Sequence, residues 1–361
     1  MYFRSSLVRA ASHTWCVNRL ILALAIALAL VLTACETSIP ANWRELRDNP
    51  PRSDFDGADE LHSAGVYVID FESGEALFGK NETEKLYPAS TVKIMTALIT
   101  LEEIGEGEAL YETIEVPQIA FAKFDTDDPN SQGGSMAGYR PGQRVTYFDA
   151  LYGLMLASGN DAANTLAYNV GGGDIEAFVA LMNDKAAEIG CINTKFANAH
   201  GLLEEESWSC AYDLALIARY AYEKFELFRE ICGTDEYFIT EDRKYTNSNA
   251  LIRNREENPF YREYVKGIKN GALDYIFYRE SVSDDEDDSL ADDGVVQGWV
   301  KRDGIANLVS IGEAGGKLYI VVTLEAPYTY GTMSVGRSRL QNAYFDHISL
   351  YEWLIETATT H

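Results

Sequence analysis

The chain has 361 residues, 47% of them hydrophobic, and a formal net charge of −26 at pH 7. This length suffices for one large globular domain or two of ordinary size. A surface with this much negative charge repels nucleic acid and anionic lipid headgroups, and we therefore expect neither as a partner. The five histidines form no HExxH or HxH pattern, which argues against a metallopeptidase, and we expect no metal ion and no cofactor.

The first 34 residues have the features of an export signal. Three arginines and no acidic residue accompany an unbroken apolar run of 13 residues, Leu20 to Leu32. A membrane span needs roughly 20 apolar residues, so the run is too short for one. It ends in Leu32-Thr33-Ala34-Cys35, which resembles the lipobox of bacterial lipoproteins. That resemblance implies cleavage before Cys35 and a lipid on its sulfur; an uncleaved signal anchor is the alternative.

Either alternative places the protein at the extracytoplasmic face of a bacterial cell membrane, and the lipobox implies that a lipid anchor holds it there. Cleavage would remove residues 1–34 and change the net charge from −26 to −29, because three arginines leave. Residues 35–60 are rich in Pro, Asp, Asn and Arg without a sustained period, and we interpret them as a lipid-anchored tether. We expect residues 61–357 to form one folded domain.

The N-terminal part of this domain is predicted to contain a β-hairpin and a helix. Alternation from residue 66 to 70, a Glu72-Ser73-Gly74 turn and an apolar run over 76–78 indicate the hairpin. Apolar residues then recur at helical spacing up to Leu101, so we expect a helix that begins at Ser90 and ends at Gly105.

Helices are expected to fill the middle of the domain and strands to return at its end. The polar, Gly-rich residues 123–143 are interpreted as a surface excursion. The predicted helices span 147–156, 161–170, 175–189 and 213–222, the later strands 296–300, 306–311 and 318–324, and the closing helix 344–355. Strands at both ends around helices predict an α+β domain whose sheet pairs N-terminal with C-terminal strands.

One acidic run and three cysteines do not by themselves indicate a function. Asp284 to Asp293 holds seven acidic residues, and we interpret residues 281–295 as a solvated loop insertion, with calcium binding as the minor alternative. Cys191, Cys210 and Cys232 allow at most one disulfide, and three buried thiols are an equal alternative.

Three short motifs carry the chemistry. In Ser90-Thr91-Val92-Lys93, helical spacing puts a hydroxyl and an amine on one face of the first turn. A lysine can serve as a base when burial and a nearby cation lower its pKa, and Lys269 is a candidate for that cation. Taken alone, Ser-x-x-Lys is a weak signal that chance produces about once in a chain of this length.

The other two motifs supply groups for proton transfer and substrate binding. Ser158-Gly159-Asn160 offers a hydroxyl to relay a proton and an amide to hold a peptide group, although such a sequence is also typical of a turn. Lys269-Asn270-Gly271 offers a cation for a carboxylate and a glycine for close backbone approach, although Asn-Gly alone most often forms a hairpin turn.

Together the motifs resemble those of the penicillin-binding D-alanyl-D-alanine carboxypeptidases, which share their fold with the serine β-lactamases. The likeness covers about residues 62–357 and extends to three flanking segments. These are Tyr87 to Ala97 around the nucleophile, Thr194 to Leu202 after the second motif, and Thr246 to Asn249 before the third. The resemblance implies a β-lactamase-like α+β fold and a substrate that is a peptidoglycan stem peptide ending in D-Ala-D-Ala, hence a role in cell-wall peptidoglycan biosynthesis and cell shape. It also implies covalent inhibition by β-lactams.

The resemblance also implies a role for each matching residue. Ser90 would be the acylated nucleophile, Lys93 its base and Ser158 the proton relay. Asn160 would bind the stem peptide, Lys269 would attract the terminal carboxylate, and the backbone N–H groups of Ser90 and Ala272 would form the oxyanion hole. His200 is better interpreted as a loop residue than as a base.

This chain departs from the family pattern at Asn270, where the family usually has a threonine whose hydroxyl helps to hold the substrate carboxylate. The leading hypothesis is an active carboxypeptidase. The alternative is a weakened or inactive lipoprotein that binds stem peptides or scaffolds wall enzymes. A β-lactamase ranks lower, because no Glu-x-x-Leu-Asn segment is present.

Overall fold

The computed structural model describes residues 55–122, 134–279, 299–328 and 341–360. The predicted export signal, Cys35 and the acidic run from Asp284 to Asp293 lie outside the described residues, so these remain predictions. No helix in the described ranges is both long enough and apolar enough to cross a membrane.

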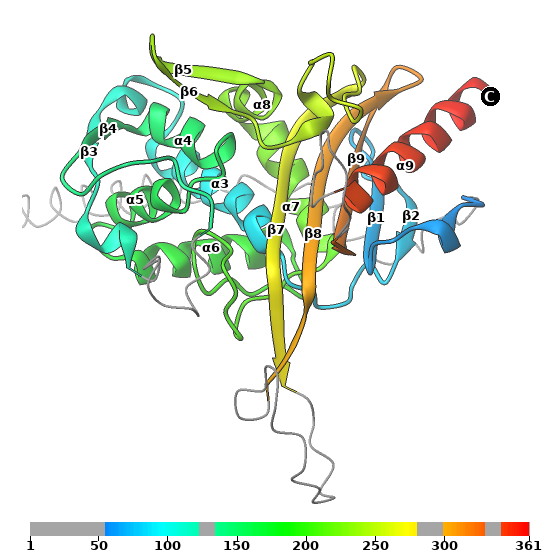
Figure 1. Cartoon of the computed structure of the whole chain (residues 1–361), viewed down its shortest axis with the longest axis horizontal. Coiled ribbons are helices and arrows are strands. Elements are labelled where there is room, and N and C mark those ends of the chain that lie inside the picture. The colour runs from blue at the N-terminus through cyan, green and yellow to red at the C-terminus, as the bar shows by residue number, and fades with distance from the viewer. Residues whose placement is uncertain (1–54, 123–133, 280–298, 329–340, 361) are drawn as a thin grey trace, which may run out of the picture. The chain divides into compact units, whose positions relative to one another are not determined.

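A five-stranded antiparallel sheet pairs the two ends of the domain, as predicted (Figure 1). Its strand order is β2-β1-β9-β8-β7, and β1 joins the N-terminal hairpin to the C-terminal strands, with Val68 opposite Val321. The strands are β1 (Gly65–Asp70), β2 (Ala76–Lys80), β7 (Val265–Arg279), β8 (Trp299–Ala314) and β9 (Lys317–Pro327). The pairing confirms the predicted α+β class.

Two of the strand predictions need correction. The segments 296–300 and 306–311 were predicted as separate strands, but residues 299–314 form the single strand β8. The strand β7 was not predicted, and Asn270-Gly271 lies inside it rather than at a hairpin turn. Thirteen residue pairs join β7 to β8 from Val265↔Gly312 to Arg279↔Trp299, so the long partner strand offsets the low strand propensity of Gly267, Asn270 and Gly271.

The sheet is covered by helices. The C-terminal helix α9 (Gln341–Thr360) packs on β8 and β9, and Figure 1 shows it in front of the sheet. Tyr344 and Tyr351 on this helix are fully buried against Val66, Val68 and Leu308. The buried imidazole of His347 hydrogen-bonds Ser310 on β8 and Thr323 on β9, so its polar atoms are satisfied inside the core.

The helical region lies beside β7 and contains the nucleophile segment (Figure 1). At its centre is α3 (Lys93–Ile104), whose residues from Lys93 to Leu101 are all buried. A helix buried on every side forms the core of its region, and α3 contacts the surrounding helices. These are α4 (Tyr147–Met155), α5 (Asn160–Val170), α6 (Ile175–Ile189) and α7 (Ala211–Lys224).

Helix ends follow local signals that the sequence contains. Thr146 accepts a hydrogen bond from Asp149 N at the start of α4, and Gly190 ends α6 in a left-handed conformation with φ +97°. The predicted helices therefore agree with α4, α5 and α6 to within one residue, whereas α7 extends two residues further at each end than predicted. The closing helix α9 begins three residues earlier and ends five residues later than predicted, and the helix expected to begin at Ser90 starts as a 3-10 turn and becomes α3 only at Lys93.

Several small elements were not predicted. They are α8 (Glu226–Gly233), the hairpin β5 (Glu236–Thr240) with β6 (Arg243–Thr246), the pair β3 (Thr113–Glu115) with β4 (Arg144–Thr146), and short 3-10 helices at Ala58–Glu60, Ala89–Val92, Glu108–Tyr111, Gln118–Phe121 and Ala250–Ile252. The ring of Phe55 packs 5.4 Å from the rings of Phe78 and Trp353. The last residues of the predicted tether therefore contact the domain.

Candidate active site

Ser90 lies in a constrained turn at the start of α3. The turn is the 3-10 helix Ala89–Val92, and Ala89 has a left-handed φ of +49°. Such a conformation costs a residue with a side chain roughly 1–2 kcal/mol, so the surroundings must hold it in place. Gly201 packs against this turn and helps to hold it, because a Cβ at this glycine would lie 1.9 Å from Ala89 O. The loop before α7 therefore packs directly under the nucleophile turn.

Lys93 lies one helical turn from Ser90, as the spacing predicts, and its side chain has no exposed surface. Its Nζ lies 3.0 Å from Ser90 Oγ, 2.8 Å from Asn160 Oδ1 and 2.5 Å from the backbone oxygen of His200. A neutral amine has two N–H donors and one lone pair. The amide and carbonyl oxygens can take the two donors, which leaves the lone pair for the hydroxyl proton of Ser90.

Burial lowers the pKa of Lys93 well below its usual value, and the positive charge of Lys269 lowers it further. The negative charge of Asp161 acts in the opposite direction but does not outweigh them. These are the two causes that the sequence predicted for this lysine. The arrangement therefore favours an unprotonated amine in contact with the serine hydroxyl.

The second motif forms the turn between α4 and α5. Ser158 adopts a left-handed φ of +56°, and Asn160 is the first residue of α5. Gly159 has no room for a side chain, because a Cβ there would lie 2.7 Å from Ala137 N and 2.9 Å from a carboxylate oxygen of Asp161. The tight turn thus places the Asn160 amide on Lys93, and Ser158 lies two residues before that contact.

Asp161 is a site residue that the motif analysis missed. Its buried carboxylate accepts backbone hydrogen bonds from Ala137 (2.7 Å), Gly138 (2.9 Å) and Tyr139 (2.8 Å). Asn160 N donates to Ser135 O at 2.8 Å in the same place. Asp161 thereby fixes the segment that packs on Asn160. An acidic residue in the first turn of a helix was the available signal, but it does not reveal which segment the carboxylate binds.

The third motif runs past the nucleophile turn on β7. A Cβ at Gly271 would lie 2.8 Å from Ser90 N and 3.0 Å from Thr91 N. The glycine was expected to permit close approach of substrate backbone; it also permits close approach of the protein's own nucleophile turn. Ala272, the next residue on this strand, is exposed.

Lys269 is also almost completely buried, with 1% of its surface exposed. Its Nζ donates to Asn270 O at 2.8 Å and to Asn270 Oδ1 at 3.1 Å. Burial lowers its pKa to about 7. At neutral pH, Lys269 therefore retains a substantial population of its charged form.

The Asn270 side chain is bound within the protein. Its Oδ1 accepts from Ser248 Oγ at 2.7 Å, and its Nδ2 donates to Ser248 O at 2.9 Å and contacts Tyr344 OH at 3.5 Å. These contacts hold the amide between the segment before β7 and helix α9. The departure from threonine therefore has a structural consequence: a short hydroxyl is replaced by an amide that contacts Ser248 and Tyr344.

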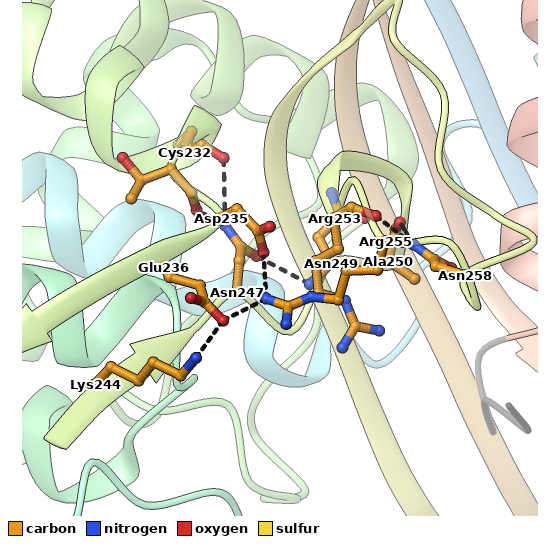
Figure 2. Close-up of polar contacts among 11 residues, drawn as sticks. Cys232, Asp235, Glu236, Lys244, Asn247, Asn249, Ala250, Arg253, Arg255 and Asn258 are labelled. Carbon is orange, nitrogen blue, oxygen red and sulfur yellow. Dashed lines mark hydrogen bonds and ion pairs between the residues drawn. The ribbon is translucent and has the colours of Figure 1, made fainter. Parts of the chain in front are cut away.

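The segment from Thr246 to Asn249 is held in place by side-chain contacts (Figure 2). Asn247 Nδ2 donates to Thr234 O at 2.9 Å, and its Oδ1 accepts from Asn249 N. Figure 2 also shows the ion pairs of Arg255 with Asp235 and Glu236, the residues that lead into β6 through β5. The segment thus has a fixed path, which positions Ser248 beside Asn270.

Five of the predicted site residues are thus connected with one another. Ser90, Lys93 and Asn160 are in direct contact, Gly271 lies against Ser90, and Lys269 acts on Lys93 through its charge. His200 contacts Lys93 through its backbone oxygen, and its imidazole Nδ1 accepts from Leu202 N. Cys191, Cys210 and Cys232 are free thiols, and burial raises the pKa of each of them.

Comparison with known proteins points to one family. A sequence profile described as "D-alanyl-D-alanine carboxypeptidase" matches residues 53–274. The D-alanyl-D-alanine carboxypeptidase DacF of Bacillus subtilis is 36% identical over 208 residues, which cover 56% of this chain and 49% of that protein. DacA of Escherichia coli K12 is 29% identical over 258 residues, 70% of this chain and 59% of that protein. The chain thus spans between half and three fifths of these relatives.

Solved structures agree on the fold. The Streptomyces K15 DD-transpeptidase superposes with a TM-score of 0.59 at 22% identity, covering 81% of this chain and 97% of that one. Penicillin binding protein 5 from Haemophilus influenzae gives 0.60 at 21% identity, covering 84% and 72%. The fold is therefore β-lactamase-like, and the chain belongs to the D-alanyl-D-alanine carboxypeptidase family.

Proposed function

We propose that the protein is a serine-type D-Ala-D-Ala carboxypeptidase that removes the terminal D-Ala from peptidoglycan stem peptides through an acyl-enzyme on Ser90. The observation that carries the proposal is the 3.0 Å contact between Lys93 Nζ and Ser90 Oγ, made by a fully buried lysine whose pKa is lowered. A serine hydroxyl becomes a nucleophile when an adjacent base removes its proton, and this lysine is placed to do so.

The first chemical step forms the ester. Lys93 takes the hydroxyl proton while Ser90 Oγ attacks the carbonyl carbon of the penultimate D-Ala. The oxyanion that forms would be bound by the backbone N–H groups of Ser90 and Ala272, and one such donor is worth roughly 3–4 kcal/mol. The close approach of Gly271 to Ser90 N supports this pairing of the two donors.

The second step breaks the peptide bond. The proton held by Lys93 passes through the Ser158 hydroxyl to the nitrogen of the leaving D-Ala, the C–N bond breaks, and the amino acid departs. Asn160 would orient the stem peptide, and charged Lys269 would attract its terminal carboxylate. Water then attacks the ester carbonyl, releases the shortened peptide and returns the hydroxyl to Ser90.

The proposed location follows from the N-terminal sequence. We propose that a lipid on Cys35 anchors the protein at the extracytoplasmic face of the cell membrane, where its substrate would be found. Radiolabelled palmitate should label the chain in cells and should not label Cys35→Ala.

The proposal is tested by intact-mass analysis of the full-length chain with two reagents. A D-Ala-D-Ala tripeptide should lose the mass of one alanine residue, and penicillin should add its own mass to the protein. Ser90→Ala should abolish both changes, while Ser73→Ala, in the exposed turn between β1 and β2, should keep them. If the unsubstituted chain shows neither change, the proposal is wrong.

A weakened enzyme or a binding protein is the second candidate, because Asn270 is bound to Ser248 and Tyr344. Its side chain would have to leave these partners to contact a substrate carboxylate. This candidate predicts penicillin labelling with little peptide turnover or, in the inactive form, neither. The two mass changes therefore separate it from an active carboxypeptidase.

A further inference from the structure

Two side chains, one on β8 and one on β9, form hydrogen bonds with the backbone just before the nucleophile. Asn307 Nδ2 donates to Tyr87 O at 2.7 Å, and Tyr87 N donates to Glu325 Oε1 at 3.0 Å. Glu325 N donates in turn to Asn307 Oδ1 at 2.7 Å. Both backbone polar groups of Tyr87 are thus bound by one connected pair of residues, three positions before Ser90.

A β-bulge creates this arrangement. In the pairing of β8 with β9, Ala306 lies opposite Ala326 and Leu308 lies opposite Thr323. Asn307 therefore faces two residues, Leu324 and Glu325, which is the geometry of a bulge. Bulges redirect side chains, and here the Asn307 amide binds the Glu325 N–H within the bulge.

Glu325 occupies this position against its own backbone preference. Its φ is +53°, in the left-handed region that glycine adopts readily. Its side chain is also buried, with 7% of the residue exposed, although a buried carboxylate is unfavourable unless it is hydrogen-bonded. A residue that combines both penalties is held by its surroundings, and such residues cluster at functional sites.

The bulge also connects the nucleophile to the third motif. Asn307 lies directly opposite Gly271 in the pairing of β7 with β8, and Gly271 runs against Ser90 N. On the other side, Leu86 is paired with Ser209 through two backbone hydrogen bonds of 2.7 and 2.9 Å. The Asn307–Glu325 pair thus fixes Tyr87 to β8 and β9, and β8 is paired with β7, the strand that carries Ala272.

We propose that Asn307 and Glu325 are positioning residues that set the distance between the Ser90 N–H and the Ala272 N–H, and so tune the oxyanion hole. This inference rests on the proposed function. Neither residue acts on the substrate; each acts through the backbone of Tyr87.

Matched substitutions at Glu325 test the inference. Glu325→Gln keeps an oxygen that accepts from Tyr87 N, so its rate of acylation by fluorescent penicillin should stay within about twofold of the unsubstituted full-length chain. Glu325→Gly removes the acceptor but suits the left-handed backbone. Its acylation should be at least about tenfold slower at every pH, while its thermal midpoint does not fall.

A purely structural role predicts the reverse pattern for Glu325→Gly, with a lower thermal midpoint and an unchanged acylation rate. Equal rates for Glu325→Gly and the unsubstituted chain, or equal slowing by Glu325→Gln, would overturn the inference. Asn307→Asp provides a second route, since it keeps the acceptor for Glu325 N and loses the donor to Tyr87 O; it should also slow acylation about tenfold. No labelling of the unsubstituted chain contradicts the proposed function, whereas equal rates contradict this inference alone.

Discussion

The two buried lysines of the site have similar burial but different surroundings. Lys93 contacts three oxygen atoms from Ser90, Asn160 and His200, and it lies in the field of another cation. Lys269 contacts only oxygens of its neighbour Asn270 among the described residues. Burial lowers both pKa values, and the positive charge of Lys269 also lowers that of Lys93.

The difference assigns separate tasks to residues of the same type. A base must be unprotonated at the working pH, and a carboxylate receptor must be charged. One charged lysine therefore helps to keep the other neutral. Variants of either lysine test this relation.

Lys93→Met should produce the largest effect. Methionine retains much of the buried volume but has no base, and a positioned base typically contributes 10²–10⁴-fold, so acylation by penicillin should fall by roughly 10³-fold. Stopped-flow or gel-based labelling measures the rate. Lys195→Met is the control, because this exposed lysine pairs with Glu206 on the surface. A rate within tenfold of the unsubstituted enzyme would contradict the assignment of Lys93 as the base.

Lys269→Gln should have a smaller effect with two parts. Turnover of a D-Ala-D-Ala peptide should fall about 10²-fold, because a charge-assisted contact to the carboxylate, worth roughly 1.5–3 kcal/mol, is lost and Lys93 becomes easier to protonate. The acidic limb of the pH–rate profile should therefore move to higher pH. Lys266→Gln on the same strand is the matched control, since Lys266 is exposed. An unmoved acidic limb would show that the two lysines are independent.

The activity of the unsubstituted enzyme should have both an alkaline and an acidic limb. As pH rises through about 7, the pKa of Lys269, its charge disappears and attraction of the substrate carboxylate weakens, by up to about tenfold per pH unit in kcat/KM. As pH falls below the lowered pKa of Lys93, the base becomes protonated. A substrate whose terminal carboxylate is amidated should show no alkaline limb. An alkaline limb that remains with the amidated substrate would show that the limb does not arise from Lys269.

Asn270→Thr should have the smallest effect and a favourable sign. It frees Lys269 Nζ from the amide oxygen and supplies a hydroxyl, and one hydrogen bond of about 0.5–1.5 kcal/mol corresponds to a gain of about two- to tenfold in peptide kcat/KM. Steady-state kinetics with the tripeptide measure it, and penicillin acylation should change less. A loss of activity would mean that the contacts of Asn270 with Ser248 and Tyr344 support the site.

The sequence predicts the features of the site that depend on local spacing. Ser90 and Lys93 meet because they are three residues apart at a helix start, and glycines end α3 and α6 where expected. The strand β7 escaped prediction because Gly267, Asn270 and Gly271 have low strand propensity, and pairing with β8 overrides it. The short helix α8 was missed because eight residues give little periodic signal.

Long-range partners could not be predicted from spacing. The His200 carbonyl that binds Lys93 lies 107 residues away along the chain, and its role belongs to the backbone rather than to the imidazole. The orientation of Asn270 depends on Ser248 and on Tyr344 of α9. A β-bulge directs the side chain of Glu325 toward Tyr87, and no residue pattern in β9 indicates that a bulge forms there.

The direct test of the account is a titration of Lys93 itself. In the full-length chain with ¹³C-labelled lysine side chains, the Lys93 signal can be assigned by its loss in Lys93→Met and followed by NMR as pH changes. The account predicts a midpoint well below 10.5 that moves upward in Lys269→Gln. A midpoint near 10.5, the same in both proteins, would contradict it.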